Sequence, residues 1–437
     1  MTNIEPASDS SEYIQHARSV PRAALHVLLL FILFEYLRLH DVLPILKTMK
    51  AQTAILAMLL LIVIAETGKG GVRVTRQGWL LLGFLGLASF TILTSTNNYY
   101  AYLYAYDLGL MLIGYFAITH ILLNEADVKI FLSLLVGIHV YLATSVILGY
   151  EHTGFDAQGY LTGFTAGSNF LGDENDVALA MIVILPMVIY LFRQASSQGA
   201  RLLWGIGSVI ILLSIIFTYS RGGFIGLAAL LLFWAVTSRN KVKAIGILLV
   251  ALMLVVAVAP PGYWQRIETI QDTQSGTAQQ RRDLWSAARR MFRDSPVWGV
   301  GGHNYGVLLP HYGLEFPDTR RPNLWGKAVH SLYFQLLAEF GLLGVLLIGS
   351  VILLNSRDLR TILSLSRDGG CSRPLGHLAE ALRGSWLGLL VAAAFVSVLT
   401  YPHLYYLTAL TVVVRRLASL EDGQVEVEPV GVLEGVA

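Results

Sequence analysis

The sequence is poor in cysteine and in charged residues. Its 437 residues include a single cysteine, Cys371, which excludes a disulfide framework and a cysteine-based metal site. Only 14% of the residues are charged, whereas 55% are hydrophobic. The apolar residues come in blocks, many of which reach the roughly 18 residues that a helix needs to cross ~30 Å of hydrocarbon. The composition therefore predicts an all-α polytopic membrane protein.

Glycine, proline and charged clusters divide the apolar sequence into about twelve segments. We expect transmembrane helices over residues 23–39, 53–65, 78–95, 99–123, 128–148, 177–192, 202–219, 222–237, 244–258, 331–354, 385–399 and 404–414. The first segment follows Arg18 and Arg22, as in a signal peptide, but no small-x-small cleavage pattern comes after it. We interpret it as an uncleaved first helix.

The distribution of lysine and arginine predicts the orientation of these helices. If both termini are cytoplasmic, the inner segments carry eighteen Lys and Arg and the short outer loops carry four, an asymmetry typical of inner-membrane proteins. The expected organisation is a cytoplasmic tail (1–22), helices 1–9 (23–260, with an outer loop at 149–176), a periplasmic loop domain (261–329), helices 10–12 (330–416) and a disordered cytoplasmic tail (417–437). No internal repeat is visible.

The two long outer segments differ in charge. The first contains no Lys or Arg and ends in Asp173, Glu174 and Asp176, which are suited either to a divalent cation or to capping the next helix; capping is the favoured interpretation. The second, residues 261–329, has nine Lys and Arg and six Asp and Glu, a balance of +3. Positive charge is disfavoured on the outer side, so its presence there calls for a reason.

Arg221 lies in a tight outer turn between two apolar helices, within Tyr219-Ser220-Arg221-Gly222-Gly223, and has no acidic neighbour in sequence. Such an arginine either reaches lipid headgroups or binds an anion. The two glycines would let a large ligand approach the backbone. We favour the anion and count Tyr219 and Arg221 as candidate ligand contacts.

Residues 277–294 (TAQQRRDLWSAARRMFRD) have the periodicity of an amphipathic helix. On a helical wheel Arg281 falls within the apolar face, whereas Arg282, Arg289 and Arg293 lie along one edge. Arg281 is therefore expected to point inward, toward the membrane domain. The alternative is that the whole arginine set binds lipid headgroups.

Residues 296–306 (PVWGVGGHNYG) form a glycine-rich turn whose backbone N–H groups could surround a phosphate. The turn lacks the Lys-Ser/Thr of a P-loop, so a nucleotide site is not expected. Packing against helices is the favoured interpretation, with His303 kept as a candidate substrate contact.

His330 stands where the polar loop returns to an apolar helix, a position that is accessible to water and yet rigid. An imidazole there could act as a general base, although a lone interfacial histidine can also be purely structural. The expected topology brings Arg221, Arg281 and His330 to one membrane face. Glu339 is nine residues further on, on the opposite side of the helix, and is expected to bond within the bundle.

Several of these features together resemble the O-antigen ligase and O-antigen polymerase superfamily. They are Ser220-Arg221-Gly222-Gly223, the run from Arg281 to Trp285 followed by Asp294-Ser295-Pro296 and Gly299-Val300-Gly301, and Val329-His330-Ser331 leading to Glu339-Phe340-Gly341-Leu342-Leu343-Gly344. Ser331 departs from the family's frequent His-Asn, and His303 is an unexpected residue in its turn.

The resemblance implies a bacterial inner-membrane glycosyltransferase that moves a glycan from undecaprenyl diphosphate on the periplasmic side, without a cofactor. It implies that Arg221 and Arg281 bind the pyrophosphate and that His330 activates the acceptor hydroxyl; Arg289, Tyr219 and His303 are further substrate-contact candidates. Ligation of O-antigen to lipid A–core is the favoured reaction. A polymerase and a protein O-glycan ligase remain alternatives, and a lipid-linked glycan flippase is the alternative of a different class.

Overall fold

A computed structural model of the chain describes residues 20–39, 43–68, 74–149, 171–238, 276–313, 316 and 324–423, with a few residues between 240 and 253. Within these residues every regular element is a helix. The helices are α2 (Arg22–Leu37), α4 (Pro44–Thr48), α5 (Ala51–Gly68), α6 (Arg76–Thr94), α7 (Asn98–Ile121), α8 (Glu125–Leu148), α9 (Glu174–Gln194), α10 (Gln198–Phe217), α11 (Arg221–Thr237), α14 (Gly276–Asp294), α15 (Asn304–Tyr312), α16 (Leu332–Asp368), α17 (Arg373–Ala392) and α18 (Pro402–Glu421).

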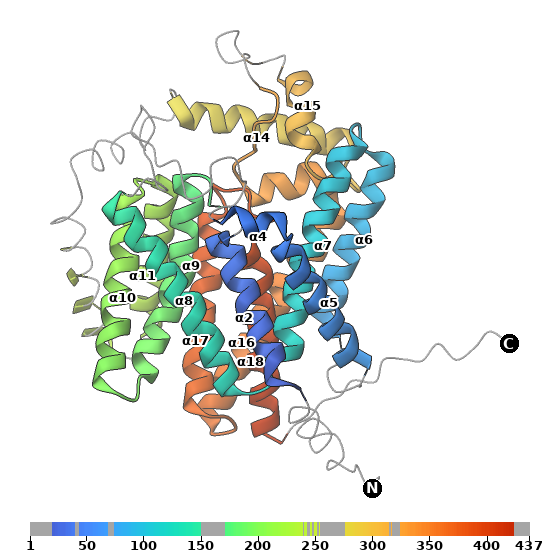
Figure 1. The fold of residues 1–437 in the computed structure, drawn as a ribbon. Coiled ribbons are helices and arrows are strands. Elements are labelled where there is room, and N and C mark those ends of the chain that lie inside the picture. The colour runs from blue at the N-terminus through green and yellow to red at the C-terminus, as the bar shows by residue number, and fades with distance from the viewer. Residues whose placement is uncertain are drawn as a thin grey trace, which may run out of the picture.

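The helices form an upright bundle, and α14 and α15 lie over one end of it (Figure 1). Within the bundle, α9 and α18 are enclosed by their neighbours: every residue from Val177 to Val188 and from Pro402 to Val414 is buried. A helix that is apolar on all sides belongs in the interior of such a bundle. Across the upper end lies α14, and α15 stands above the bundle beside the ends of α6 and α7 (Figure 1).

Six helices of the described chain are long and apolar enough to cross a membrane: α6, α7, α8, α9, α10 and α16. Two shorter apolar helices, Ala51–Thr67 and Arg221–Thr237, accompany them. The protein is therefore a multi-pass helical membrane protein. The expected count of twelve spans stays a prediction, since most of the ninth segment (244–258) and both chain ends fall outside the described residues.

Several of the expected segments have different bounds in the structure. The predicted span 404–414 lies within α18, which continues to Glu421, so the first residues of the predicted disordered tail (417–437) are helical. The predicted span 385–399 is wrong at both ends, because α17 begins at Arg373 and ends at Ala392. The charged residues of the first half of α17 suggest a loop, but Leu375, Leu378 and Leu382 bury one face of this half and make it helical. The long side chains on the other face extend to polar surroundings without ending the helix.

A further correction concerns α16, which is not one straight span from 331. Its backbone breaks at Gly341 (φ 58°, ψ −154°), a conformation open essentially to glycine alone. The short segment before the break runs across the upper end of the bundle under α14, and the longer segment descends through the bundle (Figure 1).

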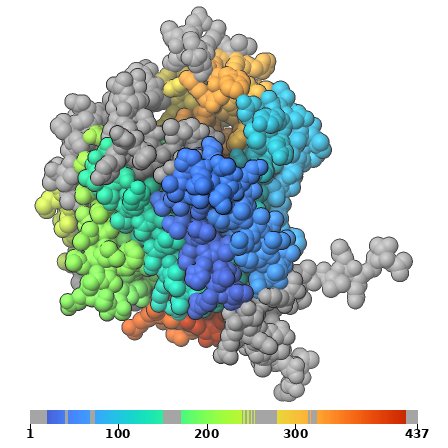
Figure 2. All heavy atoms as spheres, in the orientation of Figure 1, coloured from blue at the N-terminus to red at the C-terminus, as the bar shows by residue number. Residues whose placement is uncertain are grey.

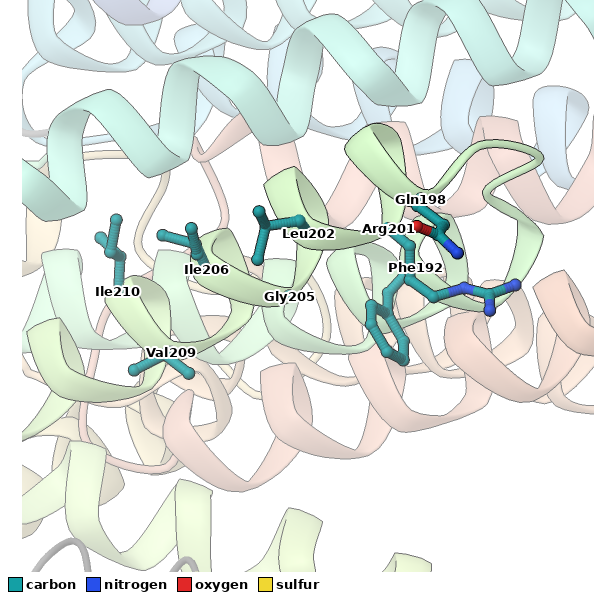
Figure 3. Close-up of a pocket in the computed structure, with 8 residues that line it drawn as sticks. All are labelled: Phe192, Gln198, Arg201, Leu202, Gly205, Ile206, Val209 and Ile210. Atoms are coloured by element: carbon teal, nitrogen blue, oxygen red, sulfur yellow. The ribbon is translucent and has the colours of Figure 1, made fainter.

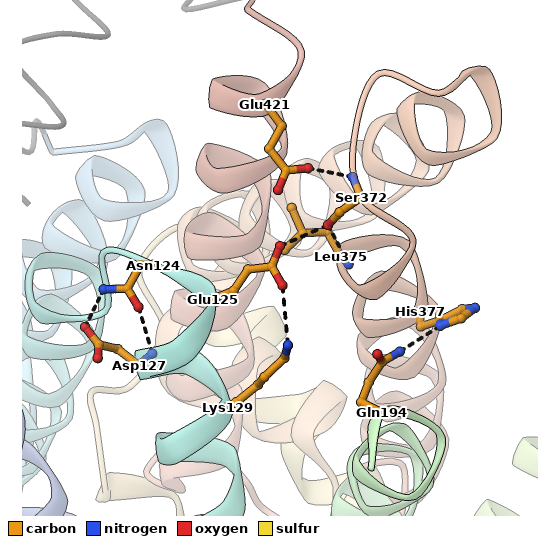
Figure 4. Close-up of polar contacts among 9 residues, drawn as sticks. All are labelled: Asn124, Glu125, Asp127, Lys129, Gln194, Ser372, Leu375, His377 and Glu421. Carbon is orange, nitrogen blue, oxygen red and sulfur yellow. Dashed lines mark hydrogen bonds and ion pairs between the residues drawn. The ribbon is translucent and has the colours of Figure 1, made fainter. Parts of the chain in front are cut away.

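The end of the bundle opposite α14 is tied together by polar contacts between helices (Figure 4). The Ser372 hydroxyl donates to Glu125 (2.9 Å), the Ser372 N–H donates to Glu421 (2.5 Å), and Gln194 bonds His377 (2.8 Å). These contacts join α8, α17, α18 and α9. They hold together the end of the bundle that lies opposite α14.

Candidate active site

Arg221 is the first residue of α11, and the start of that helix is attached to the start of α9. The Ser220 hydroxyl accepts from the Gly223 N–H (2.9 Å) and donates to Asn175 Oδ1 (2.8 Å). A Cβ on Gly223 would lie 2.7 Å from the Ala178 Cβ, so only glycine permits this approach of the two helices. Since helix N-termini favour anions, both the arginine and the helix end offer positive potential here.

Asp173 caps α9 with one carboxylate oxygen. Its Oδ1 accepts from the N–H groups of Asn175 (2.8 Å) and Asp176 (3.0 Å), which confirms the interpretation of this acidic cluster as a helix start. Only Oδ1 makes the capping bonds. The negative charge of Asp173 also raises the pKa of Arg281 and of His330.

Arg281 projects from α14 toward the bundle, as the wheel predicts. Its guanidinium lies over the Phe395 ring, 5.7 Å from the centroid. Phe395 belongs to the turn that follows α17, and a Cβ on Gly222 would lie 3.2 Å from the Phe395 Cβ. One aromatic ring therefore connects the α14 arginine with the first turn of α11.

Electrostatics link the two arginines. The pKa of Arg281 is lowered from its ordinary value, first by burial and then by the positive charge of Arg221, while Asp173 and Glu174 oppose the shift. The two guanidiniums repel one another, and an anion bound between them would remove this repulsion.

His330 is held between α14 and the turn after α17. On its N-terminal side the Val329 carbonyl accepts from the Trp285 indole (3.1 Å), and on the other side the Leu332 N–H donates to the Ala393 carbonyl (2.8 Å). The His330 backbone has a positive φ of 50°, a strained conformation of the kind that collects at functional sites.

Burial is the largest cause that lowers the pKa of the His330 imidazole, and the charges of Arg281 and Lys327 lower it further, whereas Asp173 raises it. The lowered pKa favours the neutral imidazole, which is the form that accepts a proton. The structure consequently brings Arg221, Arg281 and His330, which are far apart in sequence, to one region at the α14 end of the bundle.

A model of the O-antigen ligase family matches residues 206–349, the segment that contains these three residues. The match covers about a third of the chain, and over this segment the protein is similar to the O-antigen ligase family. No match was found among curated proteins. The match supports a membrane glycosyltransferase of the O-antigen ligase or polymerase type, with a lipid-linked glycan donor and a glycan acceptor in general.

The other predicted contact residues, Tyr219, Arg289 and His303, lie in different surroundings. Tyr219 lies two residues before the first residue of α11 and has a positive φ of 57°. Arg289 is exposed on α14, on the edge where the wheel places it. His303 packs against Tyr104 of α7, with ring centroids 5.1 Å apart, and burial lowers its pKa to about 4, so it carries no positive charge at neutral pH.

The glycine-rich turn forms hydrogen bonds to the backbone of α16 on both sides of its break at Gly341. The N–H groups of Val300 and Gly301 donate to the carbonyls of Ala338 and Glu339 (both 2.9 Å), and the Leu342 N–H donates to Pro296 (2.8 Å). A Cβ on Gly299 would lie 2.3 Å from the Glu339 backbone. These N–H groups are occupied by protein carbonyls, which agrees with the favoured interpretation of packing against helices.

Glu339 bonds within the bundle, as expected. Its carboxylate accepts from Gln335 (3.1 Å) and from the Tyr305 N–H (3.4 Å), and the His303 N–H also donates to it. The start of α15 is thereby fixed to α16, and with it the loop that carries His330.

Two residues at the candidate site, Phe395 and Asn175, are not predicted from the sequence. Phe395 lies within a segment expected to be transmembrane, and only the early end of α17 leaves its ring free to reach Arg281. Asn175 looks like part of an acidic helix start, and its bond to Ser220 joins residues 45 positions apart. Neither contact has a local sequence signal.

A groove of about 550 Å³ lies elsewhere, along the first half of α10 and the end of α9 (Figure 3). Its walls are apolar, including Leu202, Ile206 and Val209, with Gln198 and Arg201 at one end. Arg221 follows the opposite end of α10, so this groove is separate from the candidate active site. Its apolar lining suits a lipid chain better than a glycan.

Proposed function

We propose that the protein transfers a glycan from undecaprenyl diphosphate to a hydroxyl group of lipid A–core, at the periplasmic face of the bacterial inner membrane. The observation that carries the proposal is that Arg281 of α14 lies over the Phe395 ring (5.7 Å to the centroid), and the same ring packs against Gly222, next to Arg221 at the start of α11. The excess of lysine and arginine in the opposite loops supports the periplasmic orientation of this end.

The two arginines are suited to hold the diphosphate. A guanidinium offers a planar fork of N–H donors that matches phosphate oxygens and stays charged. The diphosphate is the leaving group, so negative charge accumulates on it as the glycosidic bond breaks. Fixed positive groups then stabilise the transition state more than the ground state. This arrangement would need no metal ion.

His330 would take the proton of the acceptor. The acceptor oxygen forms a bond to the anomeric carbon, its proton passes to the neutral imidazole, and the bond between that carbon and the diphosphate oxygen breaks, releasing undecaprenyl diphosphate. Attack on the face opposite the leaving group inverts the anomeric configuration. The lowered pKa of His330 suits a base that must be unprotonated before each turnover.

The test is transfer by the purified protein in lipid nanodiscs, supplied with a lipid-linked glycan and, in separate reactions, lipid A–core, a second lipid-linked unit, or a hydroxyl-bearing peptide. Ligation predicts a product with lipid A–core and inverted linkage, formed equally well with a metal chelator. Product only with the second lipid-linked unit would indicate a polymerase. Movement of the donor across liposomes without any product would favour a flippase.

A further inference from the structure

Three aromatic rings gather where the first turn of α7 meets the turn formed by residues 324–326. The Tyr99 and Tyr100 ring centroids are 6.0 Å apart, and those of Tyr100 and Trp325 are 6.2 Å apart. Tyr99 is 65% exposed and Trp325 is 61% exposed. Large aromatic surface left open in this way, on two separate elements, marks a binding surface.

Both elements are held in place by α15. Asn304 accepts from the Asn97 N–H (2.8 Å) and donates to the Asn97 carbonyl (3.1 Å), which fixes the start of α7. The Gly326 N–H donates to the Gly306 carbonyl (3.0 Å), which fixes the 324–326 turn. Figure 2 shows the atoms of α15 against the α6–α7 end. The rings are therefore preorganised and lose little freedom on binding.

The position of the rings favours a polar ligand over lipid tails. The 24 residues of α7 span roughly 36 Å, more than the ~30 Å of a hydrocarbon layer, so one end of the helix reaches beyond it. The end that carries Tyr99 is the one beside α15, which stands above the bundle in Figure 1. A polar run, Thr94 to Asn98, precedes it.

One of the three rings is close in sequence to the candidate active site. Trp325 is five residues before His330, and Lys327 between them lies near enough for its charge to act on the His330 imidazole. A glycan that extends from the reacting carbon next to His330 thus has the 324–329 turn as a path toward Trp325.

We propose that Tyr99, Tyr100 and Trp325 form a sugar-binding platform for the glycan chain that is transferred. Sugar rings present faces of C–H bonds that stack on aromatic rings, while their hydroxyls bond to phenol and indole groups. The platform would hold sugars some way from the bond that breaks. The inference rests on the proposed function and adds a binding subsite to it.

The experiment compares two donors, undecaprenyl diphosphate with one sugar and the same lipid with a long glycan, for Tyr99→Ala, Trp325→Ala and the double variant. Controls are Tyr106→Ala, an exposed tyrosine two turns further along α7, and Trp79→Ala, an exposed tryptophan at the far end of α6. The platform predicts that kcat/KM of the double variant falls about tenfold with the long glycan, the equivalent of ~1.4 kcal/mol, and is unchanged with the single sugar. Both controls should match the wild type with both donors.

Equal losses of kcat/KM with both donors would overturn the platform and point to lipid anchoring or folding. An unchanged kcat/KM with both donors would also overturn it. A binding measurement keeps the test independent of transfer. Lipid-free polysaccharide, released by mild acid from the host strain's lipopolysaccharide, is titrated onto wild-type protein in nanodiscs. If the wild type binds the polysaccharide and the double variant does not, the platform is supported even when no transfer occurs. In that case only the proposed function fails. Equal binding by the wild type and the double variant contradicts the platform.

Discussion

Phe395 offers the sharpest single-residue test of how the site is built. Its ring lies under the Arg281 guanidinium (5.7 Å to the centroid) and against the start of α11. Phe395→Leu keeps an apolar side chain in the turn but removes the π face. We therefore expect Arg281 to lose its fixed position while the packing is largely preserved.

The magnitude follows from the geometry. A cation over an aromatic face contributes about 0.5–1 kcal/mol when exposed and ~2 kcal/mol when desolvated, and Arg281 is half-buried. Converted at about 1.4 kcal/mol per tenfold, the loss corresponds to a roughly 2- to 30-fold decrease in kcat/KM. Because Arg281 is proposed to bind the diphosphate in both ground and transition state, much of that change should be a higher KM for the donor.

The assay is steady-state transfer with varied lipid-linked donor, together with thermal melting of each variant. Phe233→Leu is the matched control, since Arg383 lies over the Phe233 ring at 5.4 Å in another part of the bundle. A wild-type KM in Phe395→Leu would refute the reasoning. A similar rise of KM in Phe233→Leu would also refute it, because the effect would then be general.

Three further predictions concern the base, its charge environment and the α16 break. His330→Gln should lower kcat by about 10²- to 10⁴-fold and leave donor binding intact, as checked by single-turnover kinetics; near-normal turnover would mean that His330 only positions the acceptor. Asp173→Asn preserves a helix cap but removes the charge that raises the His330 pKa, so the acid limb of the pH–rate profile should move to lower pH; an unmoved limb contradicts this. Gly299→Ala should lower the free energy of unfolding by ~2–4 kcal/mol, because Gly299 has a positive φ and contacts the Glu339 backbone. The loss should appear as a lower melting temperature. Gly137 has open space around it, so Gly137→Ala is the control, and equal melting temperatures of the two variants would contradict this prediction.

Sequence periodicity is sufficient for most of the bundle and for the register of α14. Apolar blocks of this length have few alternatives to a helix in a membrane, so α6 to α11 begin and end within a few residues of their predicted bounds. Arg281 is placed correctly because a helical wheel depends only on local geometry. The three candidate site residues are identified from this register together with the expected topology.

Features that depend on long-range contacts could not be predicted. Charged residues in the first half of α17 resemble a loop, and only the packing of Leu375, Leu378 and Leu382 shows that they belong to the helix. The break at Gly341 exists because residues 296–301 supply hydrogen bonds to both sides of it, a partnership across about 40 positions. The contact between Phe395 and Arg281 depends on where α17 ends.

The central claim is that Arg221 and Arg281 hold one diphosphate beside His330. Its most direct test is an experimental structure of the protein with undecaprenyl diphosphate-linked sugar bound, in which the His330→Gln variant is used to slow turnover. We expect both guanidiniums within hydrogen-bond distance of diphosphate oxygens, residue 330 on the opposite side of the anomeric carbon, and Arg282 facing away. A diphosphate that is out of reach of either arginine, even through one water, would contradict it.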